Sequence, residues 1–154
     1  IGQFPPPGFF KDTPISQYSN QFKLNFLSAL NITQPLLSRL TPGASLIYMT
    51  SFLAFEPIQG MGAYSASKAA LVAWIKTLAR ETRPHVRVNV VSTTKLDSPE
   101  ARSRFGDKAT ERLISPEDVA HVIVLLTTPK TRSISGAVIP VYGNFTLEDP
   151  SSMR

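Results

Sequence analysis

The sequence predicts an α/β fold in which about three parallel strands are joined by crossover helices. Three short, mostly apolar runs bounded by turn residues alternate with three longer segments whose apolar residues recur at helical spacing. This alternation favours a parallel sheet with right-handed connections between its strands. The expected strands are 45–51, 86–92 and 136–143, and the expected helices are 13–40, 64–81 and 115–128.

The N-terminal segment is expected to be a loop or arm followed by a long helix. Residues 1–12 are rich in proline and glycine, which favour neither a regular helix nor a central strand. Thr13 is expected to cap the helix over 13–40, with Pro14 in its first position, where a proline nitrogen loses no hydrogen bond. Pro35 should bend this helix or restrict its last turns.

The later elements also have boundary signals. The runs at 45–51 and 86–92 are mostly apolar and bounded by turn residues, as expected of strands buried on both faces. The polar and charged stretch 93–114 is expected to be a flexible or lid-like segment. The helix over 115–128 should begin with Ser115 as its N-cap, because acidic residues follow in the first turn.

Composition excludes several classes of function. The 154 residues are 42% hydrophobic and 18% charged, which suits one globular domain. The net charge is +5, but the basic residues are scattered, so nucleic-acid binding is not expected. There is no cysteine, and His85 and His121 lie far apart, so no metal site is expected. Without a bilayer-spanning run or targeting signal, the sequence predicts a cytoplasmic protein with no membrane partner.

Hydroxyl side chains follow the first two expected strands. Ser51 ends the first strand, and Ser92, Thr93 and Thr94 end the second. Ligands of parallel α/β sheets bind beyond the carboxyl ends of the strands. A binding or catalytic site is therefore expected among these residues and the start of the helix over 64–81.

Tyr64 and Lys68 form the most informative pair in the chain. They lie four residues apart, so a helix would place both side chains on one face near its start. A nearby ammonium lowers the pKa of a tyrosine from its usual ~10, and such a tyrosine can exchange a proton with a substrate oxygen. Ser51, at the strand end, could hydrogen-bond the same oxygen. The alternative is that both are solvated surface residues, because this spacing often occurs by chance.

A longer stretch carries a family resemblance. The sequence "SLIYMTSFLAFEPIQGMGAYSASKAALVAWIKTLARE", followed by "VRVNVVS", resembles the C-terminal half of a short-chain dehydrogenase/reductase. That family carries a serine, a Tyr-x-x-x-Lys pair and usually an upstream asparagine as its catalytic set. The matching positions are Ser51, Tyr64, Lys68 and Asn25, and the resemblance covers roughly residues 9–143.

The resemblance implies a partial Rossmann-like, doubly wound sheet and an oxidoreductase that uses NAD or NADP to interconvert a carbonyl and an alcohol. Tyr64 would be the general acid/base, and Ser51 would orient and polarise the substrate oxygen. Lys68 would lower the tyrosine pKa and hydrogen-bond the nicotinamide ribose, and Asn25 would hold a water in the proton relay.

The resemblance also implies a set of cofactor-binding residues, in which three positions follow the second strand. Thr93 and Thr94 stand where the family usually has Pro-Gly against the nicotinamide. Ser98 matches the family's threonine that contacts the carboxamide. With Tyr64 and Lys68, these three residues are the expected cofactor-binding set.

Further departures from the family pattern concern the missing half and the C-terminus. No glycine-rich fingerprint follows a strand, so the half that binds adenosine and pyrophosphate is absent from this sequence. Residues 142–144 read Tyr-Gly-Asn where the family has Asp-Gly-Gly, and the first residue is Ile1. These features predict a fragment or truncated form of a longer enzyme.

The chain is thus expected to divide into an arm (1–12), a catalytic half-domain (13–144) and a C-terminal tail (145–154). The strand at 45–51 would lack one neighbour and leave an apolar edge exposed. The isolated chain should therefore dimerise, aggregate or fold poorly.

Two expectations about function follow. In the family, association often uses the helices corresponding to 13–40 and 64–81, which predicts a homo-oligomer acting on a small carbonyl or alcohol substrate. The alternative, from a different class, is a non-redox or catalytically silent half-fold. Such a protein would serve as a partner subunit or as a cofactor-independent isomerase or cyclase.

Overall fold

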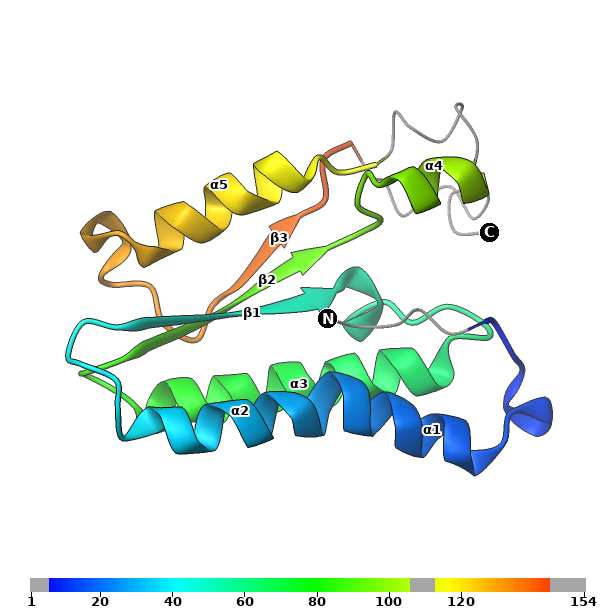
Figure 1. Ribbon diagram of the computed structural model, residues 1–154, viewed down its shortest axis with the longest axis horizontal. Helices are drawn as coiled ribbons and strands as arrows, with labels where there is room; N and C mark the ends of the chain where they lie inside the picture. The colour runs from blue at the N-terminus through cyan, green and yellow to red at the C-terminus, as the bar shows by residue number, and fades with distance from the viewer. Residues whose placement is uncertain (1–5, 106–112, 145–154) are drawn as a thin grey trace.

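The computed structural model describes residues 6–105 and 113–144 and contains a three-stranded parallel sheet (Figure 1). The strands β1 (Ser45–Ser51), β2 (Arg87–Thr93) and β3 (Val138–Val141) lie in this order across the sheet. Helices α1 (Ile15–Phe22), α2 (Ser28–Leu37) and α3 (Gly62–Glu81) lie on one face and α5 (Pro116–Thr127) on the other. α4 (Pro99–Phe105) lies beyond the carboxyl ends of the strands. The predicted fold class is confirmed.

The start of α1 differs from the prediction. The helix begins at Ile15, so Pro14 occupies the N-cap position and Thr13 lies outside the helix. The Thr13 hydroxyl instead donates to the carbonyl of Phe9 at 2.8 Å, across a short 3-10 turn. The predicted cap is therefore wrong, because a local turn that the proline-rich sequence concealed takes the Thr13 hydroxyl. Ser115, by contrast, caps α5 as predicted, since its Oγ accepts from the backbone N–H of Glu117 at 3.1 Å.

α1 and α2 are joined by a π-helical turn over Lys23–Leu27, which the sequence did not predict. Such turns are wider than an α-helical turn and often occur at functional sites. Asn25 lies in this turn and is buried. α2 continues through Pro35 and ends at Leu37, which agrees with the expected restriction of its last turns.

β1 and β2 differ in burial. All residues of β2 are buried, as predicted. Most of β1 is only half-buried, with Thr50 alone fully buried, so the prediction of burial on both faces is wrong for this strand. The reason is its position, since β1 pairs with β2 on one side and lies at the edge of the sheet. The sheet register places Ser51 opposite Thr93, so the polar carboxyl ends of β1 and β2 lie together.

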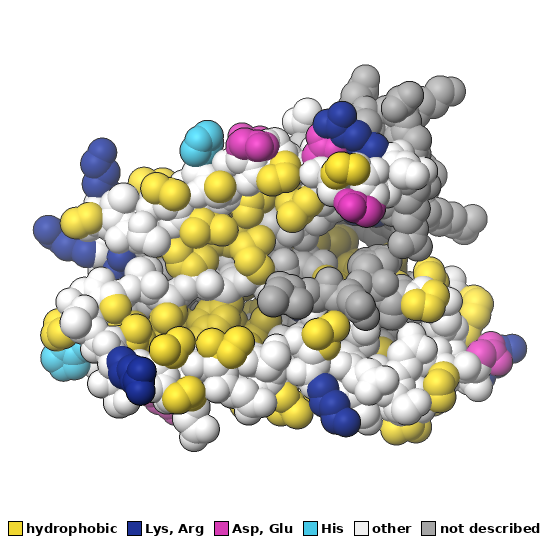
Figure 2. Space-filling model, viewed as in Figure 1, with side chains coloured by type: hydrophobic (Ala, Val, Ile, Leu, Met, Phe, Trp, Pro, Cys, Tyr) yellow, Lys and Arg dark blue, Asp and Glu magenta, His cyan; other side chains and the backbone are white. Residues whose placement is uncertain are grey.

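The sheet separates two apolar layers. Even-numbered residues of β1, including Tyr48, face α2 and α3, while Ile47 and Met49 face α5. Trp74 of α3 packs edge-on against Tyr48, with ring centroids 5.6 Å apart. Figure 2 shows hydrophobic side chains gathered in the hollow between the α5 layer and the α1–α2 layer, while most charged side chains in this view lie at the periphery.

Arg87 closes the amino end of the sheet. Its buried guanidinium donates to the carbonyls of Leu126 at 2.8 Å and Thr131 at 3.1 Å, at the end of α5 and in the turn that follows. The Leu126 carbonyl lies in the last turn of α5, where helical carbonyls lack a partner within the helix, so the arginine adds a donor there and offsets the helix dipole. Asn89, also buried, bonds the backbone of Ile134 and Ala137 and ties β2 to the approach to β3.

The stretch predicted to be a flexible lid is partly ordered. Leu96 and Ile114 form an isolated parallel bridge, and α4 lies between them in the chain. The rest of the expected lid (106–112), part of the arm (1–5) and the expected tail (145–154) lie outside the described residues. No helix in the described part of the chain is long and apolar enough to cross a membrane.

Candidate active site

Tyr64 reaches the carboxyl ends of the strands because α3 begins only two residues earlier, at Gly62. The loop from β1 passes through Gly60, whose φ of +82° is readily adopted only by glycine. The carbonyl of Gly60 accepts from the N–H of Gly8 at 3.0 Å, so the N-terminal segment holds this loop in place. The turn thus directs α3 back across the sheet with its first turn beside Ser51.

The Ser51 hydroxyl lies close enough to the Tyr64 phenol to lower the pKa of that phenol. The Ser51 Oγ also accepts from the backbone N–H of Leu53 at 3.2 Å, which fixes the hydroxyl at the end of β1. A short 3-10 turn over Phe52–Ala54 supplies this N–H. The structure therefore brings together the two hydroxyl groups that the sequence predicted to act on one substrate oxygen.

Lys68 is 7% exposed, and its Nζ lies 5.8 Å from the centre of the Tyr64 ring. Burial lowers the Lys68 pKa, because loss of water disfavours the ammonium. Burial also raises the Tyr64 pKa, and the Ser51 hydroxyl offsets this in part. The net direction for Tyr64 is thus a raised pKa, because desolvation is the largest influence on the phenol, and the lowering by Lys68 stays a prediction.

Asn25 connects the π-helical turn to the first turns of α3. Its Nδ2 donates to Gln21 Oε1 at 2.9 Å and to Ser67 Oγ at 3.0 Å. Ser67 in turn donates to the backbone carbonyl of Tyr64 at 2.7 Å. The Asn25 Oδ1 is buried and has no hydrogen-bond partner in the part of the chain that the structure describes. This acceptor is thus available to a water or ligand.

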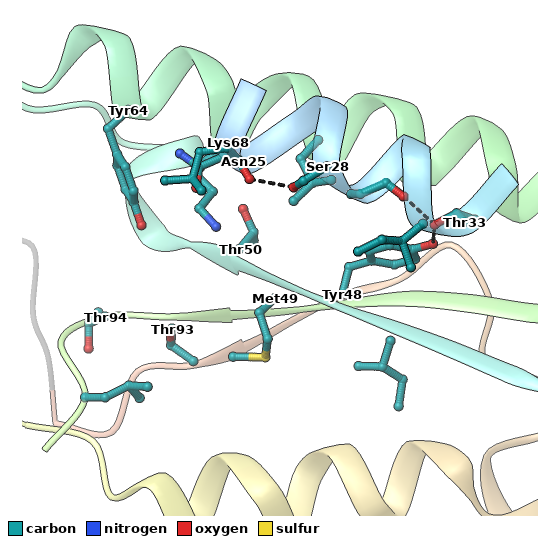
Figure 3. Close-up of a pocket in the computed structure, with 16 residues that line it drawn as sticks. Asn25, Ser28, Thr33, Tyr48, Met49, Thr50, Tyr64, Lys68, Thr93 and Thr94 are labelled. Carbon is teal, nitrogen blue, oxygen red and sulfur yellow. Dashed lines mark hydrogen bonds between the residues drawn. The ribbon is translucent and has the colours of Figure 1, made fainter. Parts of the chain in front are cut away.

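A pocket of about 580 Å³ contains most of the predicted site residues (Figure 3). Its polar lining comes from α2 and the π-helical turn, from β1, from α3 and from the end of β2. The residues labelled in Figure 3 are Asn25, Ser28, Thr33, Tyr48, Met49, Thr50, Tyr64, Lys68, Thr93 and Thr94. Ser51 contacts this set through Tyr64. Ser98 is not among the lining residues; its Oγ accepts from the N–H of Ala101 at 3.1 Å at the start of α4.

Thr50 is a pocket residue that sequence reasoning missed. It is 4% exposed, and its Oγ1 has no partner among the described residues. The Thr94 Oγ1 is also buried without a described partner. The period of two along β1 could have identified Thr50, because it places this polar residue on the same helix-facing side as Tyr48.

Comparison with known proteins defines the family. Residues 1–146 match the family model described as Enoyl-(Acyl carrier protein) reductase. The chain belongs to the short-chain dehydrogenase/reductase family. The resemblance seen in the catalytic motif is therefore confirmed at the level of the family.

Curated relatives and solved structures extend over most of this chain. It is 30% identical to "Uncharacterized oxidoreductase YvaG" of Bacillus subtilis, a match that covers 93% of this chain and 64% of the relative. It is 28% identical to "Carbonyl reductase [NADPH] 2" of Sus scrofa, covering 88% and 62%. The chain thus spans less than two thirds of the length of these relatives.

Solved members of the dehydrogenase/reductase family share the fold. A short-chain dehydrogenase from Burkholderia cenocepacia, in complex with NADP, aligns with a TM-score of 0.79 at 27% identity over 93% of this chain and 62% of the other. A glucose/ribitol dehydrogenase-type protein from Brucella melitensis aligns with a TM-score of 0.84 at 23% identity, covering 96% and 63%. The Rossmann-like character of the sheet is confirmed by these alignments.

The pocket of this family member fits a group rich in hydroxyls and amides. Lys68 offers donors, Asn25 Oδ1 offers an acceptor, and the Thr50 and Thr94 hydroxyls offer both. Buried polar atoms without partners cost free energy unless water or a ligand binds them. This donor set suits the nicotinamide and ribose of NAD or NADP. No cluster of three or more metal-binding side chains occurs within the described ranges.

Proposed function

We propose that this chain is the catalytic part of an NAD(P)-dependent oxidoreductase that interconverts a small carbonyl compound and its alcohol. The observation that carries the proposal is the placement of the Ser51 hydroxyl beside the Tyr64 phenol, at the pocket that Tyr64 and Lys68 line together. The family and the name of the porcine relative, a carbonyl reductase that uses NADPH, support the same reaction class. The NADP complex of the Burkholderia protein supports a nicotinamide cofactor.

Tyr64 acts as the general acid in the reductive direction. Because burial raises its pKa, the phenol holds its proton at neutral pH and donates it to the oxygen of the carbonyl. Ser51 hydrogen-bonds the same oxygen and orients it, since its own Oγ is fixed by the N–H of Leu53. When bound, the nicotinamide supplies the hydride for reduction or accepts it in oxidation.

Lys68 and Asn25 assist Tyr64 by binding the ligand and by holding a water. Lys68 donates hydrogen bonds to ligand hydroxyls, because its ammonium lines the pocket next to the Tyr64 ring. Asn25 Oδ1, which lacks a described protein partner, holds a water through which Tyr64 regains its proton. Thr93, Thr94 and, beyond the lining, Ser98 complete the proposed cofactor-binding set.

The test combines binding and turnover. NADPH and NADH are titrated into the purified chain by calorimetry, with circular dichroism to confirm folding, and carbonyl reduction is then followed across a panel of small ketones and aldehydes. Tyr64→Phe should reduce turnover by about 10²–10⁴-fold, because it removes the proton donor. Tyr48→Phe is the matched control, since it makes the same change in the same pocket without contacting Ser51. Unchanged turnover in a folded Tyr64→Phe variant would refute the role of Tyr64.

A second function remains open because of two specific observations. Thr93 and Thr94 replace the family's Pro-Gly, and the chain spans less than two thirds of its relatives. Both favour a partner subunit or a cofactor-independent isomerase or cyclase that uses the same pocket. A folded chain that binds neither NADPH nor NADH, alone or joined to a complementary segment, would favour this alternative.

We also propose that the family member associates with itself through the helices at 13–40 and 64–81. Ile15, Leu27, Ile32 and Leu36 of the first of these segments are exposed apolar side chains. Association would remove this surface from water. Sedimentation at several concentrations tests the proposal, and a monomer at all of them would contradict it.

A further inference from the structure

A second pocket, of about 390 Å³, lies between the C-terminal half of α3 and the loop that leads into β3. Its lining residues are Lys76, Ala79, Arg80, Arg83, Ser135 and Gly136. α3 runs from the carboxyl ends of the strands to their amino ends (Figure 1), and about 18 Å of helix separates Lys68 from Arg80, at about 1.5 Å per residue. This pocket is therefore separate from the candidate active site.

Basic residues are scattered along the sequence, but three of them converge on this pocket. Lys76 and Arg80 are exposed, and neither forms an ion pair with any residue that the structure describes. Glu81 follows Arg80 directly, but adjacent residues of a helix do not face each other, and Glu81 is not among the lining residues. The pocket thus concentrates positive charge that no described carboxylate neutralises.

The dipole of α3 explains only part of this arrangement. A helix dipole favours cations in the last turn, and Arg80 lies in that turn. Lys76 lies one turn earlier, where the effect has fallen off. Like charges four residues apart destabilise a helix, so Lys76 and Arg80 repel each other in the free protein. An anion bound between them would replace this repulsion by attraction.

The polar groups of the pocket are mainly hydrogen-bond donors. Arg83 Nη2 donates to the carbonyl of Ser135 at 2.7 Å, which orients the guanidinium and leaves its other donors without a described partner. Ser135 Oγ accepts from the N–H of Val88 at 3.2 Å, so the serine proton is available to a ligand. A lining of this kind suits a ligand whose charged group offers acceptors only.

We propose that this pocket binds the phosphate group of a small phosphorylated molecule through Lys76, Arg80, Arg83 and Ser135. A phosphate monoester carries a charge of about −1.5 to −2 at pH 7 and offers strong acceptor oxygens. Guanidinium groups bind phosphate through paired N–H donors, and an ammonium binds it as a point charge. A volume of about 390 Å³ is in the range of small-molecule sites, so an organic part fits beside the phosphate.

The site goes beyond the proposed oxidoreductase function, because none of its residues belongs to the catalytic or cofactor-binding set. It is tested by NMR on the intact chain. The amide signals are followed while chloride is replaced, at constant ionic strength, by inorganic phosphate or by glycerol phosphate. Constant ionic strength removes the effect of general screening. We expect shifts at the amides of Ala79, Arg80, Ser135 and Gly136.

The two probes separate the free ion from a phosphorylated molecule. Glycerol phosphate should bind at least as tightly as inorganic phosphate, because the pocket has room for its organic part. Binding of inorganic phosphate without binding of glycerol phosphate would contradict the assignment to a phosphorylated molecule.

Two matched double variants sharpen the result. Arg80→Gln combined with Arg83→Gln should weaken glycerol phosphate binding by at least about tenfold, because charge-assisted hydrogen bonds are lost. Arg39→Gln combined with Arg132→Gln removes the same charge outside the pocket lining, so the affinity should persist. All four arginines are exposed, so both variants should fold.

Other results would overturn the proposal. One is the absence of shifts at the pocket amides with both probes. Another is equal affinity in the two double variants, which would mean that net charge alone attracts the anion. A third is a set of shifts confined to residues around Tyr64 and Lys68, which would place the phosphate in the active site. None of these readouts uses NADPH or turnover, so failure of the proposed oxidoreductase activity would be seen separately.

Discussion

Arg87 and Lys68 are both buried cations, but they lie at opposite ends of the sheet and have opposite surroundings. Arg87, at the amino end, donates to the carbonyls of Leu126 and Thr131. Lys68, at the carboxyl end, makes no hydrogen bond or ion pair with any described residue, and its pKa is lowered by burial. One end of the sheet is satisfied internally, whereas the other is left with unused hydrogen-bonding capacity.

The different surroundings of Arg87 and Lys68 indicate which end of the sheet contributes to stability and which end contains the functional site. A buried charge without a hydrogen bond or an ion pair destabilises a fold, so such a charge persists only where it serves another purpose. The unpartnered Asn25, Thr50 and Thr94 atoms lie around the same pocket as Lys68. Substitutions at the amino end should therefore affect stability, and substitutions at the carboxyl end should affect binding and turnover.

The largest effect on stability is expected for Arg87→Met. The substitution removes buried, charge-assisted hydrogen bonds to the end of α5, so the free energy of unfolding should fall by about 2 kcal/mol. Urea unfolding measures the change, and Arg132→Met at an exposed neighbouring position is the control. A loss below about 0.5 kcal/mol, typical of surface sites, would show that the amino end is not a stability centre.

Lys68→Met should have the opposite sign. Replacing a buried ammonium that makes no described hydrogen bond or ion pair by an apolar side chain of similar length should raise the free energy of unfolding at neutral pH, on the order of 1 kcal/mol. The same variant should lose affinity for NADPH. Lys76→Met, on the exposed side of α3, is the control for both measurements. A destabilised Lys68→Met protein would mean that Lys68 stabilises the fold as Arg87 does, which would contradict the contrast drawn between the two ends of the sheet.

The pH dependence of stability should separate Lys68 from Tyr64. The folded pKa of Lys68 is lowered, so the unfolded chain binds more protons and stability should rise as pH approaches the unfolded lysine value of ~10.4. The folded pKa of Tyr64 is raised, so its contribution is present below the unfolded value of ~10 and is lost as pH rises further.

Unfolding curves at several pH values test both signs. Relative to the parent chain, Lys68→Met should lack the rise and Tyr64→Phe should lack the decline at high pH. If the two variants and the parent change in parallel with pH, neither group has the shifted pKa that its burial implies.

The smallest effect is expected for Thr50→Val, which keeps the shape of the side chain but removes an unpartnered hydroxyl. Stability should stay within about 0.5 kcal/mol or increase, because no described hydrogen bond is lost. Affinity for the ligand of the pocket should decrease, and Thr50→Ser, which keeps the hydroxyl, should restore it. Equal affinity in both variants would remove Thr50 from the binding set.

Much of the fold could be predicted because the signals are local. The strand at 45–51, the long helix beginning near Tyr64 and the Ser115 cap depend on periodicity and on side chains close in sequence. The association of Ser51 with Tyr64 could also be anticipated, since both follow from the carboxyl ends of parallel strands. The resemblance to the family's catalytic motif identified the same two residues independently.

The features that escaped prediction depend on distant parts of the chain. The π-helical turn holds Asn25, whose side chain bonds Ser67, a residue 42 positions away in the sequence. The raised pKa of Tyr64 depends on burial by several elements, which spacing alone cannot reveal. The half-buried state of β1 reflects which neighbour the strand has and which it lacks. The Thr13 cap failed for a local reason, the competing turn at Phe9.

Trp74 is the single tryptophan of the chain, and it packs edge-on against Tyr48 of β1. All indole fluorescence therefore originates next to β1, whose outer edge has no strand partner among the described residues. The Tyr48 hydroxyl bonds Thr33 of α2 at 2.5 Å, so any movement between strand and helix alters the surroundings of the indole. The emission maximum of the native protein thus reports on the state of this edge without any added label.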